Sequence, residues 1–381
     1  MQNYNEKWHV RSSRIRRRRT GSLICAIGIA PLFVPFSILA QVSGGSNYFY
    51  YHAVDPNPVT NTCLGTAGSP GFGIITDYYL TDTICGNNAS VRSIIEGQLK
   101  AMVLNGQKSL SLPIFFAESG QFAANPNNQC PTVGGTPGYG GTMMPLPDGT
   151  IPPNCMTALR SIISAAHSAG FERVRVRFVP LGPNDPYTWT QFNSSVAARN
   201  WRFLQTVHAG LSGSRLGKYD LGNEMIAGSK YPIVLQYAAY IWSQYTDAYG
   251  TSDTVGFSVP CGDACSANIS SFATVYSGTL PAVFDFHIYG NDCPGIVNAV
   301  NQTLPVDQVY NVILSALQSQ GWTSQGWIIG ETCYNDPNVA QRLLKAHRQA
   351  GNRLDSIEQW PPVSLTRVPL EYGNYLNPAR P

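Results

Sequence analysis

The chain has 381 residues, of which 43% are hydrophobic and 12% are charged, and its formal net charge is +3. The positive charge comes from the N-terminus. Residues 1–40 carry seven of the 25 Lys and Arg and one of the 22 Asp and Glu, which leaves 18 basic and 21 acidic side chains in residues 41–381. A mildly acidic body offers no electrostatic basis for binding DNA or RNA.

The N-terminal segment has the pattern of an export signal. A cluster of arginines that ends with Arg16–Arg19 precedes an uncharged, mostly apolar run over residues 23–40. Basic residues, an apolar run and a small residue at its end are typical of a secretory signal peptide. The run is also long enough to stay in place as a membrane anchor, although Pro31 and Pro35 argue against a rigid spanning helix. We therefore expect residues 1–40 to be a signal peptide or anchor, and the protein to be secreted or periplasmic.

The cysteines agree with export. Nine are present, and Cys25 lies in the N-terminal segment. The remaining eight are an even number, which in an exported chain indicates disulfide bonds. Pairing of nearest neighbours would join Cys63 to Cys85, Cys130 to Cys155, Cys261 to Cys265, and Cys293 to Cys333. Zinc is the alternative for Cys261 and Cys265, but no second His or Cys pair follows at the distance that a zinc finger needs.

Strand and helix patterns alternate along the rest of the chain. Aromatic and apolar runs predict strands at residues 48–53, 110–117, 173–178, 218–224, 254–259, 283–289, 327–331 and 354–360. Helical spacing of apolar residues predicts helices at 91–102, 156–170, 190–213, 232–249, 270–276, 309–317 and 338–350. Eight such units without a break predict one α/β domain over residues 41–381, a (β/α)8 (TIM) barrel with disulfide-closed loops.

Two glutamates follow directly on predicted strands. Glu224 ends the fourth strand after Asn223, and Glu331 ends the seventh. A barrel of this kind builds its active site at the carboxyl ends of its strands. Cleavage of a glycosidic bond needs two carboxyl groups from different elements, one to protonate the leaving oxygen and one to attack the sugar carbon or to activate water. The positions of these glutamates predict such a pair.

Strand alternation predicts which side chains face the inside of the barrel. On the sixth strand, Asp285, His287 and Tyr289 share the inner face. On the seventh, the same rule places Trp327 and Ile329 on the same face as Glu331. Polar groups are therefore expected to line the carboxyl end of the barrel.

The order of these residues resembles the retaining glycoside hydrolases of clan A. The resemblance rests on Asn223-Glu224 at the fourth strand, His287-Ile-Tyr289 at the sixth, Glu331 at the seventh and Trp360 at the eighth, and it spans nearly all of residues 41–381. A single Asn-Glu pair is a weak signal, whereas this order on successive strands is specific. The resemblance implies an O-glycosyl hydrolase that needs no cofactor and no metal.

The resemblance also implies a role for each matched residue. Glu224 would be the acid/base and Glu331 the nucleophile, with Tyr289 donating a hydrogen bond to the nucleophile. The others would contact the sugar: Asn223 at its 2-hydroxyl, His287 along the subsite and Trp360 as the floor of the pocket. A retaining pair needs its carboxyls about 5 to 5.5 Å apart, and ionisation of one then raises the pKa of the other.

Arginine is where the chain departs from the family. Many members place an arginine beside the nucleophile from an early strand, whereas the candidates here, Arg175 and Arg177, lie on the third. We expect Arg177 and His52 to be further substrate contacts. The arginines of the third strand are also expected to form a buried charge network with Asp285. Glu118 and Glu358 fit either a subsite or the scaffold.

Three functional classes remain open from the sequence. The first is an exported retaining glycosidase that acts as a monomer on a polysaccharide or oligosaccharide, with no nucleic-acid partner and no membrane contact beyond an N-terminal anchor. The second is a glycan-binding barrel without catalysis, which would not need both glutamates. The third is a metal-dependent barrel enzyme with Glu224, Asp285, His287 and Glu331 as ligands.

Overall fold

The computed structural model describes residues 42–48, 50–51, 70–71, 78, 84–85, 89–117, 143, 145–293, 302–333 and 336–360. The expected signal peptide or anchor, His52 and Glu118 lie outside these residues, as does most of the segment 118–153. Within the described part of the chain, no helix is both long enough and apolar enough to cross a membrane.

One parallel sheet forms the centre of the domain. Its strands are β1 (Ser43–Asn47), β6 (Ser109–Phe116), β7 (Arg173–Pro180), β8 (Tyr219–Asp220), β9 (Thr254–Gly256), β10 (Ser258–Cys261), β11 (Val283–Ile288), β12 (Gly326–Glu331) and β13 (Leu354–Gln359). They pair in the order β10-β11-β12-β13-β1-β6-β7-β8-β9, and all pairs are parallel. The first and last strands of this order are separated by one residue, Phe257, so the order is a ring. The fold is a (β/α)8 barrel, as predicted.

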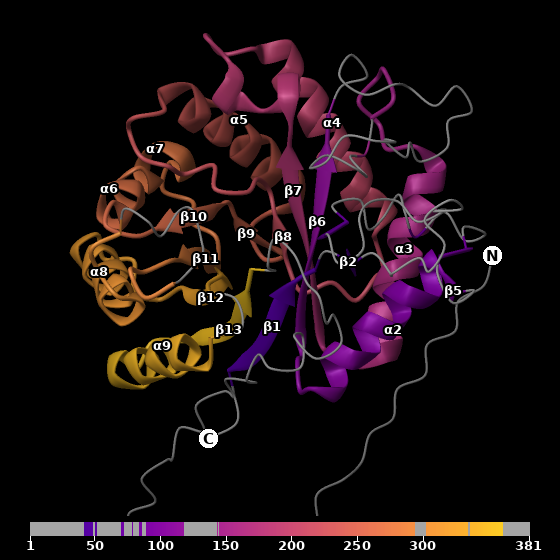
Figure 1. The fold of residues 1–381 in the computed structure, drawn as a ribbon. Coiled ribbons are helices and arrows are strands. Elements are labelled where there is room, and N and C mark those ends of the chain that lie inside the picture. The colour runs from indigo at the N-terminus through magenta and orange to yellow at the C-terminus, as the bar shows by residue number, and fades with distance from the viewer. Residues whose placement is uncertain are drawn as a thin grey trace, which may run out of the picture. The chain divides into compact units, whose positions relative to one another are not determined.

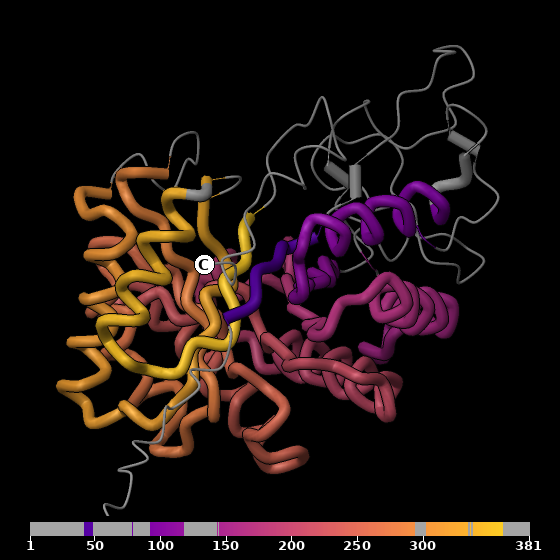
Figure 2. The backbone as a smooth tube through the Cα atoms, turned by 90° about the horizontal axis from the view of Figure 1, so that it is seen from below, coloured from indigo at the N-terminus to yellow at the C-terminus, as the bar shows by residue number. Residues whose placement is uncertain are grey.

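Helices lie around this ring of strands (Figure 1). They are α2 (Val91–Leu104), α3 (Pro153–Ala169), α4 (Ser194–Gly210), α5 (Pro232–Tyr249), α6 (Cys265–Ser270), α7 (Phe272–Tyr276), α8 (Val306–Ser319) and α9 (Pro337–Ala350), with 3-10 turns η1 (Gly182–Asn184) and η2 (Pro186–Thr188). Figure 2 shows α2 and α3 side by side on the outside. Two short antiparallel pairs, β2 (Tyr50–Tyr51) with β3 (Pro70–Gly71) and β4 (Ile84–Cys85) with β5 (Ala89–Ser90), are separate from the barrel sheet.

Alternation on β7 shows how the sequence fills the two sides of the sheet. Phe178 packs against Phe203 of α4, with ring centroids 6.2 Å apart, and so faces the helices. Arg175 and Arg177 point the other way and make ion pairs inside the barrel. The apolar layer between strands and helices is therefore continuous, while the barrel interior carries charge.

The first strand is not where aromatic residues predicted it. The prediction that residues 48–53 form the first barrel strand is wrong. That strand is β1, in the Gly/Ser segment that precedes them. A Cβ atom on Gly45 would lie 2.3 Å from the backbone oxygen of Ser109, so only glycine allows this approach of β1 to β6. Close packing in the barrel here outweighs the poor strand propensity of glycine and serine.

The seventh strand also differs from simple alternation. The pairing of β11 with β12 shifts register, since Phe286 lies beside Ile329 while His287 lies beside Glu331. Gly330 is the extra residue, and a Cβ atom there would lie 2.0 Å from Asp285 Oδ1. The prediction that Trp327 and Ile329 share a face with Glu331 is therefore wrong. A bulge turns Glu331 inward, and Trp327 packs outward against Tyr310 of α8, 4.8 Å between ring centroids.

Two of the four expected disulfides lie in the described residues, and both are confirmed. Cys261 is bonded to Cys265, which leaves these thiols unable to bind zinc, and Cys293 is bonded to Cys333. The second bond joins the segments that follow β11 and β12. Cys155 is also disulfide-bonded. Its expected partner Cys130, and Cys63, the expected partner of Cys85, lie outside the described residues.

Candidate active site

A guanidinium from β7 lies at the centre of the site. Arg177 is 1% exposed. Its Nε lies 2.8 Å from Asp220 Oδ2, its Nη2 lies 3.3 Å from Asp285 Oδ2, and its Nη1 pairs with Glu331 Oε1. Nη1 also donates to Asn47 Oδ1 at 2.9 Å. Burial alone would lower the pKa of Arg177, but the surrounding carboxylates raise it, so the group is a permanent positive charge.

Glu331 is the deeper of the two glutamates. It is 4% exposed at the end of β12. Besides its ion pair with Arg177, it accepts a hydrogen bond from the Tyr289 hydroxyl to Oε2 at 2.9 Å. Burial raises the pKa of the Glu331 carboxyl well above its usual range; Arg177 and the Tyr289 hydroxyl lower it, while the charge of Glu224 raises it further. Both of these contacts stabilise the ionised form.

A strained turn presents Glu224. The fourth strand ends at Asp220, earlier than predicted, and Asp220 Oδ1 accepts hydrogen bonds from the amides of Gly222 and Ser258 at 3.1 and 3.2 Å. Glu224 then takes the left-handed conformation, with φ of 56°. Its amide donates to Ser258 Oγ at 2.8 Å, and its backbone oxygen accepts from the Tyr187 hydroxyl at 2.6 Å. A non-glycine residue in this region costs about 1–3 kcal/mol, so surrounding contacts hold Glu224 in place.

Glu224 lies in a different electrostatic environment from Glu331. Its side chain is 25% exposed, and in the described part of the chain its ion pair is with a histidine and not with Lys or Arg. Burial raises the pKa of Glu224 to about 7, opposed by the charge of Arg177 and reinforced by that of Asp220. A carboxyl with this pKa holds a proton through neutral pH about half of the time and can donate it.

His287 lies between the two glutamates. Its Nδ1 is 2.9 Å from Glu224 Oε1 and 3.2 Å from Glu331 Oε2. Burial, together with Arg177 and Arg175, lowers the pKa of His287 well below its usual range, so the imidazole is neutral. An oxygen of each glutamate and a ring nitrogen of His287 lie within 4.8 Å of one another. The nearest oxygens of the two carboxyls are thus closer than the roughly 6.5–9.5 Å that separates an inverting pair, which favours a retaining pair.

The contacts decide which carboxyl carries the negative charge. Two carboxyls this close titrate as a pair, because ionisation of one opposes ionisation of the other. The charge is stabilised where a permanent cation and a hydroxyl donor meet it, and both Arg177 and Tyr289 meet Glu331. The shared proton therefore belongs on Glu224 when one of the two is ionised.

A second charge cluster lies one step deeper on the same strand. Arg175 pairs with Asp285 and with Glu358, the latter at 2.5 Å. Glu358 Oε1 also accepts hydrogen bonds from Ser109 and Ser356, at 2.6 and 3.2 Å. The predicted charge network around Arg175 and Asp285 is thus confirmed, and Glu358 belongs to it instead of to a subsite.

The structure brings together most of the residues selected from the sequence. Asn223 lies beside Glu224, and its buried Oδ1 has no hydrogen-bond partner in the described part of the chain. Trp360 follows β13 directly, is partly buried, and its amide donates to the Thr332 oxygen at 2.9 Å. The Trp360 backbone is thus held beside Thr332, the residue after Glu331. The expected contact His52 lies outside the described residues.

Sequence reasoning missed three residues that hold the site. Asn47 ends β1 and donates to the Gly330 oxygen at 2.6 Å while it accepts from Arg177. Asp220 connects Arg177 to the turn before Glu224, and Ser258 holds the Glu224 amide. Asp220 carries a signal that could have found it, because an acidic residue in a short buried strand needs a charged partner.

The donor sets of the site do not favour a metal ion. Asp220, Asp285 and His287 form one group of converging ligand atoms, and Glu224, His287 and Glu331 form another. Arg177 ion-pairs with carboxylates of both groups. A cation placed in either group would face this guanidinium, whose hydrogen bonds already use carboxylate lone pairs.

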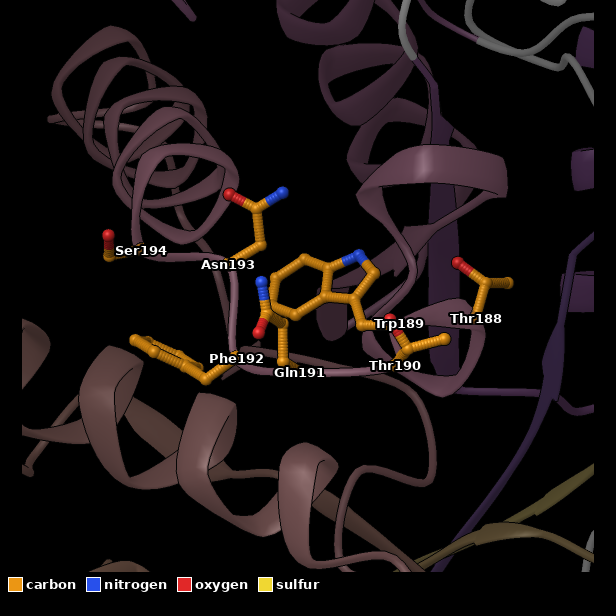
Figure 3. Close-up of a pocket in the computed structure, with 7 residues that line it drawn as sticks. All are labelled: Thr188, Trp189, Thr190, Gln191, Phe192, Asn193 and Ser194. Atoms are coloured by element: carbon orange, nitrogen blue, oxygen red, sulfur yellow. The ribbon is translucent and has the colours of Figure 1, made fainter.

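A separate pocket lies on the segment between η2 and α4. It has a volume of about 480 Å³ and is lined by residues 188–194 (Figure 3). Trp189 donates its indole N–H to the Pro183 oxygen at 2.7 Å and packs edge-on against Tyr237, 5.5 Å between ring centroids. Trp189 therefore packs the segment onto α5, and no residue of the glutamate site lines this pocket.

Comparison with known proteins gives structural likeness only. No protein-family model and no curated protein matches the sequence. Solved structures that resemble the chain include an exo-β-1,4-mannosidase from Opitutaceae bacterium strain TAV5, with 12% identity and a TM-score of 0.49 over 88% of this chain. The chain spans 55% of the length of that mannosidase.

Two further solved structures are similar over more of their own length. A Bacteroides ovatus GH5 xyloglucanase in complex with a XXXG heptasaccharide has 11% identity and a TM-score of 0.48 over 89% of this chain and 73% of its own. A GH5_18 protein from Streptomyces cattleya in complex with Manβ1-4GlcNAc has 12% identity and a TM-score of 0.49 over 89% and 78%. At these identities no substrate is carried over, and the barrel assignment rests on the strand order described above.

Proposed function

We propose that the chain is an exported retaining glycoside hydrolase that cleaves a β-linked polysaccharide or oligosaccharide. One observation carries the proposal: two glutamates from different strand ends converge on His287 at the separation of a retaining pair, in opposite electrostatic settings. Glu331 meets a permanent cation, whereas Glu224 is partly exposed and faces His287, with no Lys or Arg of the described residues paired to it. A glycan-binding barrel would have no need of this division of charge.

In the first step, Glu331 attacks the anomeric carbon while Glu224 donates its proton to the glycosidic oxygen. The bond from the sugar to that oxygen breaks, and a glycosyl ester on Glu331 forms. Arg177 and Tyr289 hold the attacking oxygens in place and keep them ionised before attack. Asn223 Oδ1 is available to accept from the sugar 2-hydroxyl, a contact that strengthens in the transition state.

In the second step, water resolves the ester. Glu224, now ionised, takes a proton from a water molecule as that water attacks the anomeric carbon, and Glu331 leaves as a carboxylate. The two inversions give net retention of configuration. His287 stays neutral throughout and donates its Nδ1 hydrogen to whichever neighbouring carboxylate is ionised.

Export is supported by the basic and apolar N-terminal pattern and by the disulfides. Disulfides such as Cys261–Cys265 and Cys293–Cys333 persist in oxidising compartments. We propose a secreted or periplasmic monomer, which fractionation of cells that express the full chain and light scattering of the product would test. N-terminal sequencing that finds residue 1 still in place on a membrane-bound product would favour the anchor over the cleaved signal.

The test of the mechanism is azide rescue. Wild type, Glu224→Ala and Glu331→Ala are assayed on β-linked polysaccharides and aryl β-glycosides, with and without sodium azide. We expect wild-type cleavage, a β-glycosyl azide from Glu224→Ala and an α-glycosyl azide or nothing from Glu331→Ala, because azide replaces the base-activated water in one case and the nucleophile in the other. Glu172→Ala is the matched control, since Glu172 is exposed and pairs only with Lys108 among the described residues.

Two outcomes would overturn the proposal. Swapped azide products would reverse the roles of the two glutamates. If the wild type cleaves nothing but binds glycans with an affinity that depends on Trp360, the protein is a glycan-binding barrel.

A further inference from the structure

Two exposed tyrosines lie beside Glu224. Tyr187 of η2 and Tyr231, which directly precedes α5, are each 38% exposed. Their rings meet edge to face, with centroids 5.1 Å apart and planes at 76°. In the described part of the chain the other exposed large hydrophobic side chain is Leu104, at the end of α2. An exposed aromatic pair at a site rim indicates a binding surface more than a packing contact.

The pair is fixed to the turn that carries Glu224. The Tyr187 hydroxyl donates to the Glu224 backbone oxygen at 2.6 Å, and the Glu224 carboxyl keeps its separate contact with His287. Tyr187 follows the carboxyl end of β7 and Tyr231 follows that of β8, so both lie at the rim where this fold binds substrate. The Lys230 ammonium lies over the Tyr231 ring, 5.4 Å from its centre.

The two glutamates give the site a direction. The general acid touches the oxygen of the leaving sugar, while the nucleophile lies under the sugar that is retained. The Trp360 amide donates to the oxygen of Thr332, the residue after Glu331, and we therefore assign Trp360 to the side of the retained sugar. Tyr187 is hydrogen-bonded to the Glu224 backbone and Tyr231 packs against Tyr187, so we assign the tyrosine pair to the leaving side.

We propose that Tyr187 and Tyr231 form a platform that binds the leaving sugar of the substrate. The inference rests on the proposed function, and it narrows that function to substrates with at least one sugar beyond the scissile bond. The axial C–H bonds of a pyranose stack on an aromatic face. The hydroxyl of Tyr187 is already engaged with the backbone, so its ring is held at a fixed angle for such stacking.

The experiment compares two kinds of substrate on the same variants. Cellotetraose and mannotetraose have sugars on both sides of the bond, whereas β-D-glucosyl and β-D-mannosyl fluoride have a leaving group of one atom, which needs no platform. We expect Tyr231→Ala relative to wild type, and Tyr187→Leu relative to Tyr187→Phe, to lower kcat/KM for the tetraoses by about three- to tenfold and to leave the fluorides within about twofold. Tyr187→Phe should keep the ring and most of the activity. Leu104→Ala is the control for loss of an exposed apolar side chain.

Binding of the tetraoses is measured by calorimetry on the same variants, so that the two proposals can fail separately. Cleavage by the wild type tests the proposal that the protein is a glycosidase. Dependence of cleavage and binding on the two tyrosines tests the proposal of a platform. Equal losses on tetraoses and fluorides, or no loss of cleavage and binding in either tyrosine variant, would overturn the platform while the glycosidase stands. Tyrosine-dependent binding without any cleavage would keep the platform and reject the enzyme. If the wild type neither cleaves nor binds any of these saccharides, both proposals fail.

Discussion

Arg175 and Arg177 lie two residues apart on one face of β7, yet they serve two different layers of the barrel. Arg175 lies between Asp285 and Glu358, and the serines of β6 and β13 complete the hydrogen bonds of Glu358. Arg177 lies one layer nearer the rim, where it pairs with Glu331. Each carboxylate of the deep layer pairs with an arginine, whereas at the rim the carboxylate of Glu224 pairs with a histidine only, among the described residues.

The imbalance at the rim comes from Glu224. No Lys or Arg among the described residues ion-pairs with it, its backbone is in the left-handed region, and its pKa is raised to about 7. A carboxyl in such a setting costs stability, and proteins retain such groups where chemistry needs a proton donor. The comparison teaches that neighbouring layers of the barrel treat carboxyls differently: every carboxylate around Arg175 has an arginine partner, whereas the rim, where we propose the reaction takes place, leaves Glu224 without one among the described residues.

The largest expected effect is on the rim layer. Glu224→Gln should lower kcat for oligosaccharides by roughly 10²- to 10⁴-fold, the usual contribution of general acid catalysis. The loss should be much smaller for the first step on a 2,4-dinitrophenyl glycoside, whose leaving group needs no proton. Burst and steady-state kinetics on both substrates measure this, with Glu172→Gln as the control. An equal loss in the first step of both substrates would mean that Glu224 is not the acid.

The next largest effect is on the deep layer. Arg175→Met leaves Asp285 and Glu358 without their shared cation, and we expect the free energy of unfolding to fall by about 3–5 kcal/mol. Adding Glu358→Gln should recover part of the loss, since one uncompensated charge is removed. Urea denaturation measures both variants.

Arg353→Met is the matched control for the deep layer. Arg353 pairs with Asp355 at the surface, where its side chain is 62% exposed, so its loss should cost less than about 1 kcal/mol. A similar cost for Arg175→Met and Arg353→Met would remove the distinction between a sealed layer and ordinary surface pairing.

The sequence predicted the later part of the barrel better than the first strand. Regular apolar runs such as Val283–Ile288 have one stable location, between helices and barrel interior, so their periodicity is informative. β1 has no such run, because its place depends on contact with β6 instead of on its own propensity. The bulge at Gly330 is also a matter of packing, since it depends on the carboxylate of Asp285 in the neighbouring strand.

The site was predictable to the same extent. Residues at strand ends, such as Glu224, His287 and Glu331, could be selected because strand ends of a barrel face one rim. Asn47 could not, because its strand was misplaced by the aromatic residues that follow it. Tyr187 could not either, since its contact with Glu224 joins two loops that no periodicity describes.

A smaller effect links the rim layer to pH. The folded-state pKa of Glu224, about 7, lies above the ordinary 4.5, so the folded chain binds more protons than the unfolded chain between these values. Its contribution to stability is therefore fully present below about pH 4.5 and lost as the pH rises through 7. Glu224→Gln should leave stability nearly unchanged at pH 4.5 and increase it at pH 8 by up to about 3 kcal/mol.

Chemical denaturation of wild type and Glu224→Gln at both pH values measures this difference. Subtracting the two free energies of unfolding at each pH cancels the contribution of the other titrating groups. The activity of the wild type should fall with an apparent pKa near 7 on the alkaline side, where the acid loses its proton. A gain in stability that is the same at pH 4.5 and pH 8 would show that Glu224 lowers stability for a reason other than its negative charge.

The smallest effects concern the floor of the deep layer, where Gly45 of β1 meets Ser109, the residue whose hydroxyl bonds to Glu358. Gly45→Ala puts a Cβ atom 2.3 Å from the Ser109 backbone oxygen, so strands must move apart, and we expect a loss of about 1–3 kcal/mol. Gly97→Ala is the matched control, because Gly97 is exposed inside α2 and an added Cβ meets nothing within 4 Å. It should gain about 0.5–1 kcal/mol from helix propensity. Thermal or urea unfolding of both variants measures whether each substitution lowers or raises the free energy of unfolding. If Gly45→Ala is as stable as Gly97→Ala, β1 does not press against β6, and a glycine-rich first strand would need another explanation.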